Sequence, residues 1–219
     1  MIAAHQTMLA PQGAPLPYDA EVEYIEGTGD QFLDTGYKTC ESSHMVFDAM
    51  YNGYATSGYS STMLFGSQTS VGGAEATALA VWLNSNGKMS FNDIGFDSGW
   101  VSSPTIASGS RHVFAIENRT LFLDGTSIRS SGATGAYRST VSVCLLRANT
   151  PTGYQSGSNR RMKGRIYSFS ASESGILAFD GIPVRVGSGS SAVGYLFDRV
   201  SGELFGNAGT GAFVIGPDK

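Results

Sequence analysis

Three glutamates near the start of the chain have the residue type and spacing that acid–base chemistry on a sugar requires. They are Glu21, Glu23 and Glu26. Residues i and i+2 of a strand share a face, so Glu21 and Glu23 can lie close together, and a β-bulge would bring Glu26 onto that face. Retaining glycoside hydrolysis uses two carboxyl groups about 5–5.5 Å apart. The segment is therefore the main enzymatic candidate. The alternative is a first strand whose glutamates face solvent.

A tyrosine-rich stretch follows the next predicted strand. Tyr51, Tyr54 and Tyr59 alternate with Asn, Gly, Ala, Thr and Ser. Tyrosine gives a rigid amphipathic contact surface, and the small polar residues give adaptable hydrogen bonds. Recognition usually resides in loops at the ends of a rigid scaffold. These three tyrosines are predicted as ligand-binding residues for a sugar or a protein. The alternative is a tyrosine-rich surface loop without a ligand.

A basic cluster stands out in an acidic chain. Arg160, Arg161 and Lys163 come within four residues, shortly before Arg165. Such a cluster suits an anionic glycan or a partner protein, and the first three residues are predicted as further ligand-binding residues. The alternative is an edge or loop start that is kept soluble by charge, which also blocks edge-to-edge pairing.

Metal and cofactor chemistry has little support in the sequence. The histidines are His5, His44 and His112. Their spacing indicates neither a metal cluster nor a catalytic triad, and His112, before an apolar run, is expected to be structural. No dense Asp/Asn loop has calcium-binding spacing. The prediction is no metal and no cofactor.

Two cysteines, Cys40 and Cys144, lie far apart in the chain. Cys144 is inside an apolar run, which predicts a small buried hydrophobic residue. A disulfide between the two cysteines is the alternative. Without CxxC spacing, a thiolate zinc site is not expected.

Many short segments with strand character must position these residues. The expected strands are 21–26, 32–35, 44–51, 62–67, 77–84, 88–94, 111–118, 120–124, 140–147, 163–171, 175–179, 182–186, 193–198 and 212–215. Turn chemistry separates several of them: 84–87 (NSNG), 124–125 (DG) and 180–181 (DG). Short strands at this spacing indicate a sandwich or barrel.

Composition agrees with an all-β fold and excludes several classes of protein. Glycine supplies 29 of 219 residues, and only 15% are charged, so helix-forming residues are scarce. The net charge of −4 argues against a nucleic-acid partner. No run of 18 apolar residues exists, so membrane insertion is not expected.

Residues 1–20 differ from the rest of the chain. Pro11, Pro15 and Pro17 favour extended backbone. We expect an extended N-terminal arm or linker at 1–20 and one sandwich at 21–219. The first residues lack the basic start and apolar core of a secretory signal. We expect a protein of a virion, or one outside the cell or on its surface.

Two ends of the chain carry a family resemblance. The segment 22–37 (VEYIEGTGDQFLDTGY) is similar to the opening of concanavalin A-like lectin/glucanase domains, which occur in proteins of gut bacteria and their phages. The segments 182–185 (IPVR), 194–198 (GYLFD) and 205–213 (FGNAGTGAF) resemble the closing part. The segment 121–125 (LFLDG) is similar to a hairpin of laminin-G-like domains.

The resemblance implies a two-sheet antiparallel jelly-roll sandwich of the concanavalin A-like type. It implies little about ligand, since this fold hosts lectins, glycosidases and adhesion modules. The resemblance to laminin-G-like domains also implies calcium as an alternative to no metal, with Asp93, Asp97 and Asp198 as the candidate ligands. In the related β-glucanases, the carboxylate motif has a central Asp and lies mid-chain beside tryptophans. Here the central residue is Glu23, the strand is the first one, and the chain has only Trp82 and Trp100. We therefore predict no catalytic residue and no enzyme.

The sequence predicts a non-enzymatic adhesion or structural module, with glycan binding as an added role. Its setting would be a phage virion (fibre, tail or capsid decoration) or a bacterial surface assembly. Expected partners are neighbouring protein subunits and a cell-surface glycan, not nucleic acid. The alternatives are a carbohydrate-binding lectin that acts alone and a glycoside hydrolase.

Overall fold

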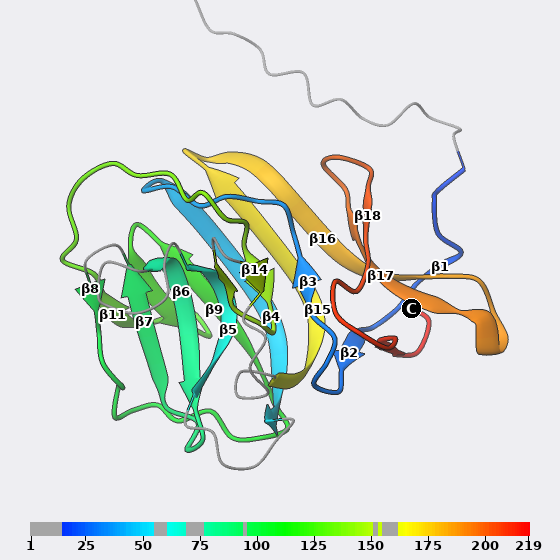
Figure 1. The fold of residues 1–219 in the computed structure, drawn as a ribbon, viewed down its shortest axis with the longest axis horizontal. Coiled ribbons are helices and arrows are strands. Elements are labelled where there is room, and N and C mark those ends of the chain that lie inside the picture. The colour runs from blue at the N-terminus through cyan, green and yellow to red at the C-terminus, as the bar shows by residue number, and fades with distance from the viewer. Residues whose placement is uncertain (1–14, 55–60, 69–76, 94–95, 151–152, 155–161) are drawn as a thin grey trace, which may run out of the picture.

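Two antiparallel β-sheets packed face to face make up most of the described part of the chain (Figure 1). The computed structural model describes residues 15–54, 61–68, 77–93, 96–150, 153–154 and 162–219. Within these residues the fold is a jelly-roll β-sandwich without α-helices, which confirms the predicted fold class. No described helix is long and apolar enough to cross a membrane.

The larger sheet carries most of the long strands. Its order is β11 (Thr126–Ser130), β10 (Thr120–Leu123), β9 (Ser110–Glu117), β4 (Ser43–Tyr54), β15 (Met162–Glu173), β16 (Ile176–Val186), β17 (Val193–Asp198) and β18 (Leu204–Phe205). Three short strands join it: β1 (Ala20–Glu21) beside β16, and β2 (Ile25–Gly27) between β15 and β19 (Val214–Ile215).

The smaller sheet covers the inner face of the larger one. Its order is β3 (Leu33–Asp34), β12 (Cys144–Leu145), β5 (Ser61–Gln68), β6 (Thr77–Asn84), β7 (Met89–Asp93) and β8 (Phe96–Asp97). A separate pair joins β13 (Asn149–Thr150) to β14 (Gly153–Tyr154), and a 3-10 turn, η3 (Gly189–Ser191), links β16 to β17.

Phenylalanine rings fill the space between the sheets. Phe47 of β4 lies 5.4 Å from Phe65 of β5 and 6.1 Å from Phe169 of β15, measured between ring centroids. All three rings are completely buried. The contacts arise because period-2 alternation points every second residue of β4 inward, while the residues between them face outward.

Most predicted strands lie where alternation placed them, but one predicted turn is wrong. Asp124 (φ 49°) and Gly125 (φ 78°) do form the turn between β10 and β11. Asp180 and Gly181 lie inside β16 instead, which continues from Ile176 to Val186. A Cβ on Gly181 would lie 2.6 Å from Leu196 Cδ2. Glycine is needed there for close packing, not for a turn.

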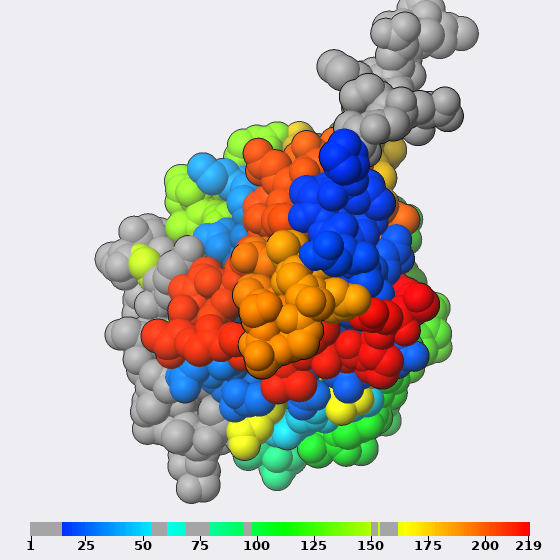
Figure 2. Space-filling model, turned by 90° about the vertical axis from the view of Figure 1, so that its right-hand side faces the viewer, coloured from blue at the N-terminus to red at the C-terminus, as the bar shows by residue number. Residues whose placement is uncertain are grey.

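The N-terminal segment is bound to the sandwich earlier than expected. The Tyr18 ring lies 5.0 Å from that of Phe197, and Asp19 N donates to Arg185 O at 2.9 Å. Ala20 pairs with Arg185 across β1 and β16. Figure 2 shows this blue segment against the orange and red C-terminal segments. Residues 18–20, assigned to the arm by sequence, therefore pack with the sheet; residues 1–14 lie outside the described part.

Both cysteines are buried free thiols, so the alternative of a Cys40–Cys144 disulfide is wrong. Cys144 lies in β12 with no exposed surface, as its apolar neighbours predicted. Burial raises the pKa of the Cys144 thiol, so it is unreactive at neutral pH.

We predict that Gly181→Ala destabilises the fold by about 1–3 kcal/mol, the usual effect of overpacking. The added methyl would collide with the side chains of Leu196 and Phe179, which are both buried in the core and would have to shift. Gly132→Ala is the matched control, because a Cβ there meets nothing within 4 Å. Urea denaturation of both variants checks this, and equal midpoints would contradict it.

Candidate functional site

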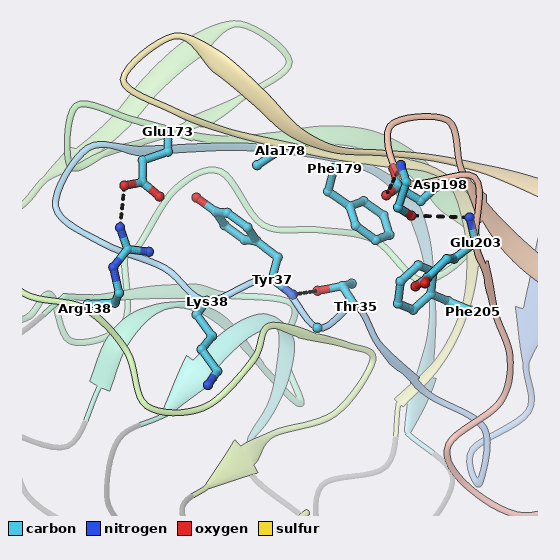
Figure 3. A pocket seen from close by; sticks show the side chains of 12 residues that line it. Thr35, Tyr37, Lys38, Arg138, Glu173, Ala178, Phe179, Asp198, Glu203 and Phe205 are labelled. Carbon is cyan, nitrogen blue, oxygen red and sulfur yellow. Dashed lines mark hydrogen bonds and ion pairs between the residues drawn. The ribbon is translucent and has the colours of Figure 1, made fainter. Parts of the chain in front are cut away.

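A groove opens where the ends of both sheets meet the C-terminal strands (Figure 3). Its volume is about 490 Å³. The lining residues come from the segment after β3, the loop before β12, and the ends of β15 to β18: Thr35, Gly36, Tyr37, Lys38, Arg138, Glu173, Ala178, Phe179, Asp198, Ser201, Glu203 and Phe205. This size lies within the range of small-molecule sites.

Aromatic rings form the apolar part of the groove. Phe179 and Phe205 meet edge to face with centroids 5.2 Å apart, and Figure 3 shows Tyr37 further along the same pocket. The Tyr37 hydroxyl lies 2.7 Å from Ser43 Oγ and donates to Ser172 O at 3.3 Å. Burial raises the pKa of this phenol, so it remains protonated, and its hydrogen bonds fix the ring in place.

Charged groups of both signs surround the rings. Arg138 and Glu173 form an ion pair across the groove (Figure 3). The hydrogen bond from Arg138 lowers the pKa of the Glu173 carboxyl. Lys38 and Glu203 are exposed and form no ion pair within the described residues. These two side chains are free to bind a ligand.

Asp198 holds the turn that carries Glu203. Its Oδ1 accepts from Asp180 N at 2.7 Å and Val200 N at 3.1 Å, and its Oδ2 accepts from Ser201 N at 3.1 Å. Asp198 is almost fully buried, with 2% of its surface exposed. Asp198 therefore supports the groove instead of presenting a charge to a ligand.

The predicted ligand-binding tyrosines are not part of this groove. Tyr51 lies in β4, which extends to Tyr54, and it is only 4% exposed because it shares the inward face with Phe47 and Ala49. The expectation of an exposed Tyr51 is therefore wrong. The side chain of Tyr54 and all of Tyr59 lie outside the described residues.

The basic cluster is not at an edge where the structure describes it. Arg160 and Arg161 lie outside the described residues, and Lys163 is half-buried in β15, a central strand paired with β4 and β2. The edge interpretation is therefore wrong for Lys163. Arg165 Nε donates to Glu26 Oε2 at 2.8 Å. The guanidinium of Arg165 is therefore paired with a carboxylate of the neighbouring strand β2.

The three N-terminal glutamates differ in their exposure to solvent. Glu21 and Glu23 are exposed, with Glu21 4.0 Å from Lys219 Nζ. Glu26 is half-buried in β2 and also accepts from Asn52 Nδ2 at 3.1 Å. The solvent-facing interpretation holds for the first two, and Glu26 is a structural ion-pair partner.

Two of the three calcium candidates have other roles. Asp93 is fully buried, 3.6 Å from Arg119 Nε, and Asp198 binds the backbone as described above. The side chain of Asp97 lies outside the described residues. Among the side chains that the structure describes, no three His, Cys, Asp or Glu residues are grouped to hold a metal ion.

One cluster resembles a nucleophile–base–acid relay. Ser110 Oγ lies 2.9 Å from His112 Nε2, and His112 Nδ1 lies 2.7 Å from Asp124 Oδ2. However, the Ser110 hydroxyl donates to Ala107 O at 2.6 Å, so its proton points away from the imidazole. Asp124 Oδ1 also accepts from Val113 N at 2.9 Å. The cluster links the turn before β9, at Ala107 and Ser110, to the turn between β10 and β11, at Asp124. His112 therefore has a structural role.

Comparison with known proteins assigns the chain to no family. No protein-family model and no curated protein matches the chain. Among solved structures, an alginate lyase of polysaccharide lyase family 7, AlgAT5, is similar with 10% identity, 63% of each chain covered and a TM-score of 0.44. A Trypanosoma rangeli sialidase in complex with 2,3-difluorosialic acid is 13% identical over 70% of this chain and 27% of its own, with a TM-score of 0.45. The same sialidase with the inhibitor DANA gives a TM-score of 0.42 at 13% identity over the same shares.

These likenesses overturn one prediction about function. The chain was expected to be a non-enzymatic adhesion or structural module of a phage virion or a bacterial surface assembly. The comparisons contradict that prediction: the three structures named above are those of a lyase and a sialidase, and they give no evidence of a phage or adhesion role. The chain spans 63% of the lyase and 27% of the sialidase, and likeness at this level says nothing about its own activity.

We predict that Arg138→Met raises the pKa of the Glu173 carboxyl toward its ordinary value of about 4.3. The pair lowers this pKa in the folded state, so it stabilises the fold above the ordinary value, and that contribution is lost as pH falls through the folded value. A carboxyl ¹³C NMR titration measures the change. Arg129→Met, whose side chain donates to Ser98 O instead, is the control. An unchanged Glu173 titration in Arg138→Met would refute the prediction.

Proposed function

We propose that the chain is a non-catalytic carbohydrate-binding β-sandwich, and that the groove between Tyr37 and Phe205 holds a sugar. One observation carries the proposal: an aromatic floor lies directly beside unpaired groups of both charges. A sugar ring has an apolar C–H face that packs on an aromatic ring, and its hydroxyls donate and accept hydrogen bonds. Lys38 can donate to such hydroxyls and Glu203 can accept from them.

A neutral sugar suits this groove better than an acidic one. Lys38 and Arg138 are balanced by Glu173 and Glu203. An anionic ligand would meet carboxylates as often as cations, which costs free energy because like charges repel.

As part of the proposal, we place the chain among concanavalin A-like lectin/glucanase (laminin-G-like) domains. The expected subunit partners and location stay predictions.

The carboxylates of the groove support binding more than hydrolysis. Glycoside hydrolysis needs two carboxyl groups that reach the scissile bond, one as general acid and the other as base or nucleophile. Glu173 is held by Arg138, and Asp198 accepts three backbone N–H groups. Only Glu203 remains uncommitted within the described lining. One carboxylate can accept a sugar hydroxyl but cannot act as both acid and base or nucleophile.

Lys38→Ala and Glu203→Gln should each weaken sugar binding about tenfold, roughly 1.4 kcal/mol, because each removes a hydrogen bond to a charged group. Isothermal titration with sugars selected from a glycan screen measures this. Glu117→Gln, an exposed carboxylate on β9 that does not line the groove, is the matched control. If both groove variants bind like the control, the sugar binds elsewhere.

The same sugars, as oligosaccharides, should give no new reducing ends during prolonged incubation with the protein. The reason is the single uncommitted carboxylate of the groove. A reducing-end assay against buffer alone checks this. Turnover that disappears in Glu203→Gln would overturn the non-catalytic proposal, and turnover that disappears in Glu23→Gln would place chemistry at the N-terminal strand.

A further inference from the structure

The hairpin between β15 and β16 places an exposed apolar side chain beside the groove. Ser174 (φ 51°) and Gly175 (φ 80°) form its two-residue turn, so Glu173 and Ile176 are the pair that flanks the turn. Residues paired across antiparallel strands point to the same face of the sheet. Since Glu173 lines the groove, Ile176 stands on the groove side as well.

The neighbouring leucine points the other way. Leu177 pairs with Ser172, one position further from the turn, so it projects from the opposite face. The register then shifts by one residue, and the extra residue, Ala178, lines the groove. Ile176 is 54% exposed and Leu177 49%, so two similar apolar side chains differ mainly in the face that they occupy.

The hairpin tip is held firmly enough to act as a wall. Ser174 N donates to Ser42 O at 3.3 Å, and the Ser174 and Ser42 hydroxyls lie 3.1 Å apart. On the inner side, Tyr37 donates to Ser172 O. The position of Ile176 relative to the groove is therefore fixed by contacts of the turn and of β15, with which Ile176 pairs through Glu173.

We infer that Ile176 extends the groove into a subsite for an apolar substituent of the bound sugar. The ligand class is a saccharide that carries an alkyl or aryl group next to the ring held between Tyr37 and Phe205. The inference rests on the proposed sugar-binding function. Ile176 is exposed on the face of the hairpin that also carries Glu173, so it offers such a substituent an apolar surface beside the groove.

The test uses methyl and hexyl glycosides of glucose, galactose, mannose and N-acetylglucosamine, titrated into the whole chain. For the sugar that binds, the hexyl glycoside should bind about tenfold more tightly than the methyl glycoside, as expected for covering part of an isoleucine side chain. Ile176→Ser should remove this preference and keep the affinity for the methyl glycoside. Leu177→Ser should retain the preference, since its side chain faces away.

The outcomes separate this inference from the proposed function. Equal affinities for methyl and hexyl glycosides, or a preference that survives Ile176→Ser, overturn the subsite and leave sugar binding intact. The subsite is also overturned if Lys38→Ala and Glu203→Gln do not weaken binding of the hexyl glycoside, because the alkyl chain would then bind apart from the groove. No binding of any glycoside overturns both.

Discussion

The contact of Phe47, Phe65 and Phe169 joins the two sheets, and the remaining structure is arranged around it. These rings come from β4, β5 and β15, so they connect the longest strands of the large sheet to the small one. The chain of rings continues from Phe169 to Phe179 at 5.6 Å and from there to Phe205. The groove floor is thus the outer end of the core. Its apolar surface exists because the packing reaches the edge of the sandwich.

Alternation along the strands made the fold predictable. β6 and β17 have the bounds that the pattern of side chains gave, and the inward residues of β4 are those with period-2 spacing. The prediction of a turn failed where glycine has a second role, that of allowing close packing inside a strand. Asp–Gly favours a hairpin turn, yet at 180–181 Gly181 is there because Leu196 approaches the backbone.

The groove could not be predicted because no single segment carries it. Tyr37, Arg138, Glu173 and Glu203 are dispersed along the chain, and each looks ordinary among its sequence neighbours. Tyr51 shows the opposite error. Its neighbours have the composition of a recognition loop, but the strand continues through it and its side chain enters the core. A signal that the sequence analysis missed is the Ser174–Gly175 dipeptide, whose turn fixes which residues flank the groove; Gly175 was instead assigned to a strand.

The two ends of the described chain lie side by side, with a mechanical consequence. Val22 pairs with Asp218, Glu23 N donates to Pro217 O at 2.8 Å, and Lys219 N donates to Glu21 O at 3.0 Å. Tension applied between residues 21 and 219 would load these antiparallel hydrogen bonds one after another, as in opening a zipper, and not all together as in shear. The end segments would peel from the sheet at low force, while the strands that frame the groove stay under no tension.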